Sequence, residues 1–174
     1  MPIVMEYLAH SIEGFVHFVT AMIAMIAGTV VLFSRKGTLF HKRWGYVYFG
    51  AMAIMLCTSF MIYRLFNGVG IFHYAAIASS ITLVAGFVPL IWRQVIPNWL
   101  EWHFSMMYWS VIGLYAAFLA EAFTRIPSSP FLGMVGITFL LTMIVGGVYW
   151  RKLSVKWSQL FPSSRIARHK SNDL

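Results

Sequence analysis

Five long stretches without a single Asp, Glu, Lys or Arg constrain this chain more than any other feature. They cover residues 14–33, 44–63, 65–92, 102–120 and 126–150. Each stretch is long enough to cross the ~30 Å hydrocarbon core of a bilayer as a helix. A composition of 60% hydrophobic and 10% charged residues is also unlike that of soluble domains. The sequence therefore predicts an all-α integral membrane bundle of five transmembrane helices.

Turn residues at the breaks in hydrophobicity place the ends of these helices. The predicted helices cover residues 8–33, 42–65, 71–92, 98–124 and 131–150. Residues 1–150 then form one five-helix transmembrane domain, and residues 151–174 form a basic tail. The first part of the tail carries Leu153 and Trp157 among basic residues, which is typical of a helix lying on the membrane surface. After Pro162 the tail is predicted to be disordered.

The positive charges are divided unevenly between the two ends of the predicted helices. Of the 13 Lys and Arg residues, only Arg64 and Arg125 fall on the side of the second and fourth loops. The positive-inside rule then predicts an external N-terminus and a cytoplasmic C-terminal tail. The net charge of +8 is explained by this topology and does not call for nucleic acid as a partner. Besides the bilayer itself, anionic lipid is the expected partner of the tail.

Histidines supply the candidate chemistry, because ionisable groups inside a membrane are costly and commonly functional. Five of the six lie in or beside the first four predicted helices: His10, His17, His41, His73 and His103. The first and third helices place theirs near the outer face, whereas the second and fourth place theirs near the inner face. This alternation predicts a four-helix core, with the fifth helix outside it, that binds something at two depths.

Imidazoles from facing helices are a common way to hold haem iron from both sides. His17 and His73 are the predicted outer pair and His41 and His103 the predicted inner pair of haem b ligands. Counting ~1.5 Å per residue, His41 lies about 10 Å shallower than the best opposite of His103. The leading hypothesis is a small b-type cytochrome that carries electrons across the bilayer, with a quinone among its candidate partners.

Two other functions remain open. The outer face carries enough ligands for a Zn or Fe site of a metal-dependent membrane enzyme. That metal set consists of His10, Glu13, His17, His73 and Glu121. Alternatively, the chain is a cofactor-free structural or assembly subunit of a homo-oligomer or a membrane complex. Lys42 and Arg43, beside His41, are candidate partners for haem propionates if the first hypothesis holds.

Several of these residues also carry a resemblance to a known family. The likeness rests on His17 with Gly28, on the segment 37–48, on Phe72-His73, and on the segment 103–108. On these residues the chain resembles an uncharacterised bacterial family of predicted membrane proteins, a domain of unknown function, whose most distinctive element here is His41-x3-Gly45-x2-Tyr48. The resemblance implies a four-helix core in the bacterial cytoplasmic (inner) membrane and no established activity.

A second likeness is one of architecture only. The alternation of histidines is similar to that of the two-haem cytochrome b561 class. This similarity implies one haem b near each membrane face and an oxidoreductase that passes electrons between them.

Overall fold

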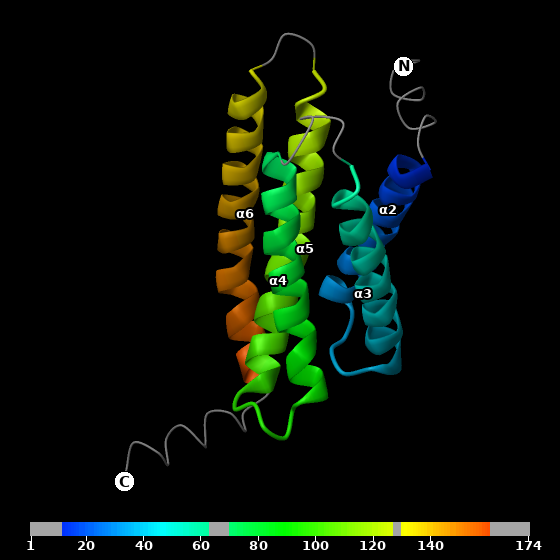
Figure 1. Ribbon diagram of the computed structural model, residues 1–174. Helices are drawn as coiled ribbons and strands as arrows, with labels where there is room; N and C mark the ends of the chain where they lie inside the picture. The colour runs from blue at the N-terminus through cyan, green and yellow to red at the C-terminus, as the bar shows by residue number, and fades with distance from the viewer. Residues whose placement is uncertain (1–11, 63–69, 127–129, 161–174) are drawn as a thin grey trace.

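The computed structural model describes residues 12–62, 70–126 and 130–160, with side chains up to residue 157. Five helices account for most of these residues, and no strand occurs in the described ranges (Figure 1). They are α2 (Ile12–Phe33), α3 (Leu39–Ser59), α4 (Ile71–Ile91), α5 (Trp99–Phe123) and α6 (Phe131–Leu160). The predicted all-helical fold is confirmed.

Helix boundaries agree with the prediction best for α4 and α5, which differ by one residue at most. α3 begins at Leu39, slightly earlier than predicted, because the Thr38 side chain caps it by accepting a hydrogen bond from the backbone N–H of His41. The prediction was wrong for the end of α3, which lies at Ser59 and not at residue 65. It was also wrong for α6, which continues past residue 150 to Leu160. The first part of the predicted tail is therefore the end of α6. Residues 8–11 and the remainder of the tail lie outside the described residues.

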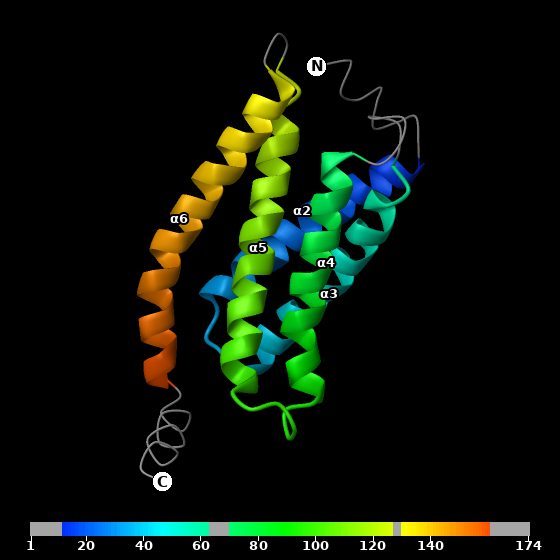
Figure 2. The ribbon, with the colours of Figure 1, turned by 60° about the vertical axis from the view of Figure 1, so that its left-hand side comes forward.

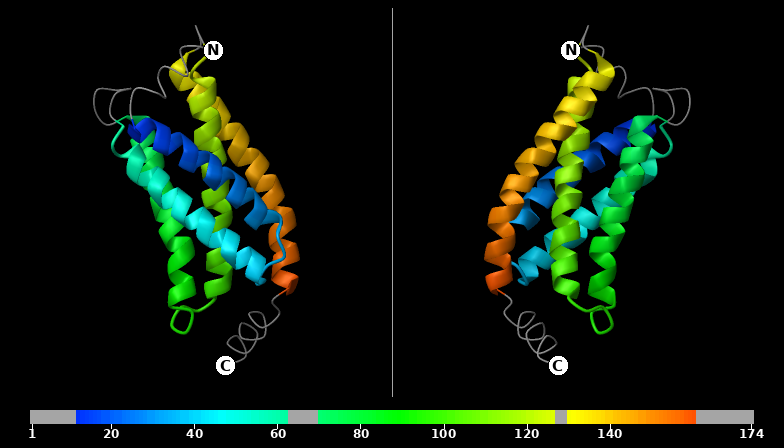
Figure 3. Two further views of the ribbon diagram at one scale, coloured as in Figure 1. Left: turned by 90° about the vertical axis from the view of Figure 1, so that its right-hand side faces the viewer. Right: turned by 90° about the vertical axis from the view of Figure 1, so that its left-hand side faces the viewer.

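The helices pack as two hairpins and one additional helix. Contacts between α2 and α3 and between α4 and α5 are extensive, and α6 packs along α5. The two hairpins meet through smaller contacts of α3 with α4 and of α2 with α5. In Figures 2 and 3 the α2–α3 hairpin runs obliquely to α4, α5 and α6. The bundle therefore consists of four core helices and a fifth that covers α5.

The tightest crossing of the core lies at Gly28 of α2. A Cβ at this position would lie 3.0 Å from Tyr48 Cε2 and 3.1 Å from Val111 Cγ2. The Tyr48 ring is fully buried, and its hydroxyl is hydrogen-bonded to Ser110 Oγ at 2.8 Å. Three helices thus converge on a glycine, because only a residue without a side chain leaves room for the tyrosine.

The surface of the bundle is apolar, as expected of a protein surrounded by lipid. Large hydrophobic side chains are exposed on every helix, among them Phe33, Tyr74 and Leu141. Four helices are long and apolar enough to cross a membrane: α2, α4, α5, and α6 up to Trp157. These features support a multi-pass membrane protein. The fifth crossing, by α3, stays a prediction, since the first turns of α3 carry Lys42 and Arg43.

One end of the bundle collects most of the described basic residues, and we refer to it as the basic face. It is formed by the loops 34–38 and 92–98 and by the C-terminal end of α6 (Figure 1). The described Lys and Arg residues at this end are Arg35, Lys36, Lys42, Arg43, Arg93, Arg151, Lys152 and Lys156. Arg125 is the one described basic residue at the opposite face.

Candidate functional site

His103 lies in the second turn of α5, near the basic face, and its ring reaches α4. His103 Nδ1 lies 2.7 Å from the carbonyl oxygen of Gly86. Because a carbonyl oxygen can only accept, Nδ1 carries the ring proton and donates it. The neutral ring therefore keeps its lone pair on Nε2. A hydrogen bond of this kind orients an imidazole and makes its other nitrogen a better metal ligand.

The glycine at position 86 makes this contact possible. A Cβ there would lie 2.7 Å from Met107 Sδ and 3.2 Å from Met106 Cβ, both on α5. A side chain at position 86 would push against the helix that carries His103. The absence of one lets α4 and α5 approach closely enough for the Gly86 carbonyl to meet the imidazole.

His41 has the same hydrogen-bond polarity as His103. It is the third residue of α3, where Thr38 fixes the start of the helix. Its Nδ1 lies 3.0 Å from Ser34 Oγ, and that hydroxyl is directed to the Val31 carbonyl at 3.1 Å. Since the serine proton is engaged with the carbonyl, Ser34 Oγ accepts from His41 Nδ1. His41 therefore also keeps its lone pair on Nε2.

Lys36 lies in the loop between α2 and α3, shortly before His41 in the chain. Its Nζ donates to the carbonyl oxygens of Val31 and Leu32, at 2.7 and 2.9 Å, and so satisfies two acceptors at the end of α2. The same atom lies 4.9 Å from the ring centroid of Trp157 on α6. Burial lowers the pKa of Lys36 from 10.5 to about 8. The cation is thus held in a partly desolvated position at the junction of α2 and α6.

Lys36, His41 and His103 interact electrostatically with one another. The Lys36 charge acts on both His41 and His103, and His103 acts on His41. From the sequence, a depth offset of about 10 Å is expected between the two rings. That offset assumed a helix beginning at residue 42, whereas α3 begins at Leu39 and runs obliquely to α5 (Figure 3). We refer to the group as the basic-face site, which consists of Ser34, Lys36, His41, Gly86, His103 and Trp157.

Aromatic side chains close the α6 side of the basic-face site. Trp157 is 5% exposed, and its ring meets Phe104 edge-on at 5.3 Å between centroids. Tyr108 and Trp150 lie in the same cluster, and the Tyr108 hydroxyl donates to the Gly146 carbonyl at 2.6 Å. The tail residue predicted to lie on the membrane surface is therefore part of the packed interior.

Lys42 and Arg43 were the predicted propionate partners, but both side chains are exposed on α3. Lys36, which was not singled out from the sequence, is the partly buried basic residue of this region. One feature of the sequence could have drawn attention to Lys36. Lys36 follows the last residue of α2 by three positions, where a lysine side chain can reach back to the final carbonyls of the helix.

His17 lies far from this site, near the opposite end of α2. Its Nδ1 is within hydrogen-bonding distance of the Met55 carbonyl, at 3.1 Å, and of Thr58 Oγ1, at 3.2 Å. Thr58 directs its own proton to the Met55 carbonyl, so His17 Nδ1 is the donor. His17 thus ties α2 to the end of α3 and keeps its lone pair on Nε2.

His73, the predicted partner of His17, has the opposite polarity. Its Nδ1 accepts a hydrogen bond from the Gly70 backbone N–H at 3.1 Å, so the proton of the neutral ring lies on Nε2. His73 is buried and is the third residue of α4, where an accepting side chain satisfies the start of the helix. The imidazole therefore has a local structural task at the position where the outer haem ligand was expected.

The predicted metal set of the opposite face is not gathered in the part of the chain that the structure describes. No three His, Cys, Asp or Glu side chains come together there in a way that could hold a metal ion. Glu121 forms an ion pair with Arg125, and both side chains are more than 40% exposed. Glu13 lies in the first turn of α2. His10, the remaining predicted ligand, falls outside the described residues.

Residues 41–48 of α3 combine a packed side chain with an open position. His41 and Tyr48 are seven residues apart and lie on one face of α3. Tyr48 points into the core, where it bonds Ser110, and a Cβ at Gly45 would meet no described atom within 4 Å. The helix turn after His41 therefore presents open space rather than a packed side chain.

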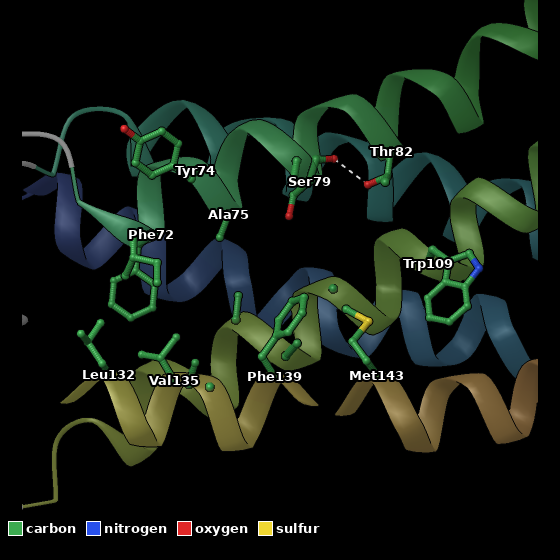
Figure 4. Close-up of a pocket in the computed structure, with 17 residues that line it drawn as sticks. Phe72, Tyr74, Ala75, Ser79, Thr82, Trp109, Leu132, Val135, Phe139 and Met143 are labelled. Atoms are coloured by element: carbon green, nitrogen blue, oxygen red, sulfur yellow. Dashed lines mark hydrogen bonds between the residues drawn. The ribbon is translucent and has the colours of Figure 1, made fainter. Parts of the chain in front are cut away.

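A separate pocket lies on the other side of α5. It is a groove of about 530 Å³ between α4 and α6, with small residues of α5 such as Gly113 and Ala117 lining it (Figure 4). Phe72, Leu132 and Phe139 are among its apolar walls. None of the four histidines in the described residues lines this groove. It is an apolar surface distinct from the basic-face site.

Comparison of the chain with protein-family models, with curated proteins and with solved structures found no match.

Proposed function

We propose that the chain is a small membrane cytochrome that binds b-type haem at the basic-face site, where His41 and His103 would hold the iron. The observation that carries this proposal is the shared hydrogen-bond polarity of the two rings. Each donates from Nδ1, to Ser34 or to Gly86, and each keeps a lone pair on Nε2. The rings come from different hairpins, and His103 interacts electrostatically with His41.

The surroundings of the two rings also suit a bound macrocycle. Gly45 leaves open space one helical turn after His41. Lys36 supplies a positive charge at the end of the site nearest the aqueous phase. Trp157 and Phe104 form an apolar wall that excludes water. When bound, haem iron supplies one-electron chemistry, accepting an electron from a reduced donor and passing it on.

The chain's own residues would set the properties of this centre. The Gly86 carbonyl and Ser34 Oγ hold the imidazoles in the ligating tautomer and increase the basicity of Nε2. Burial among the helices would keep water away from a bound group. We therefore propose one centre near the basic face, because the polarity of His73 disfavours the second, outer pair expected from the sequence.

The topology belongs to the same proposal. We place α3 across the bilayer beside α2, because the two helices have nearly the same length, 21 and 22 residues, and pack together extensively. The positive-inside rule places the basic face in the cytoplasm. The haem would then lie toward the cytoplasmic side of a bacterial inner membrane, within reach of a cytoplasmic or quinol electron donor.

A set of His→Gln variants tests the ligand assignment. Glutamine can still donate to the Gly86 carbonyl or accept from Gly70, but it is a poor ligand for haem iron. We expect the purified wild type to show the sharp reduced absorption bands of six-coordinate b haem. His41→Gln and His103→Gln should each lose at least nine-tenths of the haem, or bind it with a five-coordinate spectrum.

His73→Gln is the matched control, because glutamine at the third position of a helix serves as a capping acceptor. This variant should keep the wild-type spectrum and haem content. Loss of haem from His73→Gln, with full retention in His103→Gln, would contradict the ligand assignment. A folded wild type that stays colourless when produced with ample haem would refute the cytochrome function itself.

A further inference from the structure

Lys36 is the one Lys or Arg residue of the basic-face site. Its Nζ donates hydrogen bonds to the last carbonyls of α2 and lies close to the ring of Trp157 on α6. Its positive charge also acts on His41 and His103. The other basic residues of the first loop and the start of α3, Arg35, Lys42 and Arg43, are exposed. Lys36 is therefore the one basic side chain of this region that is directed into the bundle.

Within the described residues the positive charge of Lys36 is only partly balanced. The C-terminal end of a helix carries about half a negative charge, and α2 offers two carbonyls to Nζ. Within the described ranges the one ion pair is that of Glu121 with Arg125, at the opposite face. Of the three N–H groups of the ammonium, two donate to carbonyls. Within the described residues the third makes no hydrogen bond, so it can donate to an anion beside the Trp157 ring.

We propose that Lys36 Nζ binds a carboxylate of the group held between His41 and His103. This inference rests on the proposed function and specifies how the ligand is oriented. Haem b carries two carboxylates on one edge of its macrocycle. With the iron between the two Nε2 atoms, a carboxylate on Lys36 turns that edge toward the basic face and the apolar edges toward the core. Lys36 then selects one orientation of the ligand.

A comparison of haem b with its dimethyl ester tests the contact, because esterification removes both negative charges and leaves the iron unchanged. The full-length apoprotein in detergent micelles is titrated with each compound, and the dissociation constants are read from the Soret absorbance. The variants are Lys36→Met, Lys36→Arg, and Lys42→Met as the matched control on an exposed lysine. Partitioning of each compound into micelles is common to all variants and cancels in the comparison.

We expect the wild type and Lys42→Met to bind haem b tighter than the ester by the same ratio. In Lys36→Met this ratio should fall by about tenfold or more, as expected for loss of a charge-assisted hydrogen bond. Lys36→Arg should retain most of the preference. Far-UV circular dichroism and gel filtration show whether each variant keeps the fold.

The outcomes separate this inference from the function on which it rests. If Lys36→Met binds haem and keeps the wild-type ratio, Lys36 does not contact a carboxylate, and its task is confined to closing the end of α2. If the wild type binds neither haem b nor the ester, the proposed function is overturned as well.

Discussion

Replacement of Gly28 by alanine should destabilise the bundle, and the structure gives the size of the effect. The added Cβ would lie 3.0 Å from Tyr48 Cε2 and 3.1 Å from Val111 Cγ2. Carbon atoms in favourable contact are about 3.5–4.0 Å apart, so each neighbour must retreat by roughly 0.5 Å. The Tyr48 ring has little freedom to do so, because it is fully buried and its hydroxyl is bonded to Ser110.

The expected free-energy change combines two opposing terms. Overpacking of a well-packed core costs about 1–3 kcal/mol. Alanine is favoured over glycine inside a helix by about 0.5–1 kcal/mol, which offsets part of this cost. Gly50→Ala provides the matched control, since a Cβ at Gly50 would meet no described atom within 4 Å. The control should be neutral or slightly stabilised, and the difference between the two variants isolates the overpacking.

Equilibrium unfolding in mixed micelles of a mild detergent and sodium dodecyl sulfate, followed by circular dichroism, measures both variants. We expect Gly28→Ala to be less stable than Gly50→Ala by about 1–3 kcal/mol. Equal stability, or a more stable Gly28→Ala protein, would refute the three-helix crossing at this glycine. Tyr48 would then have to be free to move away from α2.

Three further predictions address the site and the topology. Reporter tags should show a cytoplasmic C-terminus and an external N-terminus; the reverse arrangement would move the basic-face site to the outer leaflet. Glu13→Gln should leave haem content unchanged, whereas loss of bound metal from that variant would support the competing metal site. Burial lowers the pKa of Lys36 to about 8, so between about pH 8 and 10.5 the unfolded chain binds more protons there than the folded chain does. The unfolding temperature of the ligand-free wild type, relative to that of Lys36→Met, should therefore rise from pH 7.5 to 9.5, and parallel profiles would contradict this.

The sequence by itself determined the helical membrane fold. Segments without charges can be placed in a bilayer only as helices that satisfy their own backbone hydrogen bonds, so hydrophobicity and length were sufficient to find them. The positions of α4 and α5 followed to within one residue. The start of α3 and the end of α6 were not placed as well. The first depends on the Thr38 cap, and the second depends on the packing of Trp157 against Phe104.

Only the tertiary structure decided what the histidines do. Their depths could be counted along each helix, but the polarity of an imidazole depends on which group meets Nδ1, and that group usually belongs to another element. Gly86 of α4 and Ser34 of the first loop accept hydrogen bonds from Nδ1 of His103 and His41, and this leaves the lone pair of each ring on Nε2. Gly70 does the reverse for His73. From the sequence, Lys36 could not be distinguished from the other basic residues that set the topology. Its contact with Trp157 depends on the tilt of a hairpin and on the path of α6, and neither can be read from residue spacing.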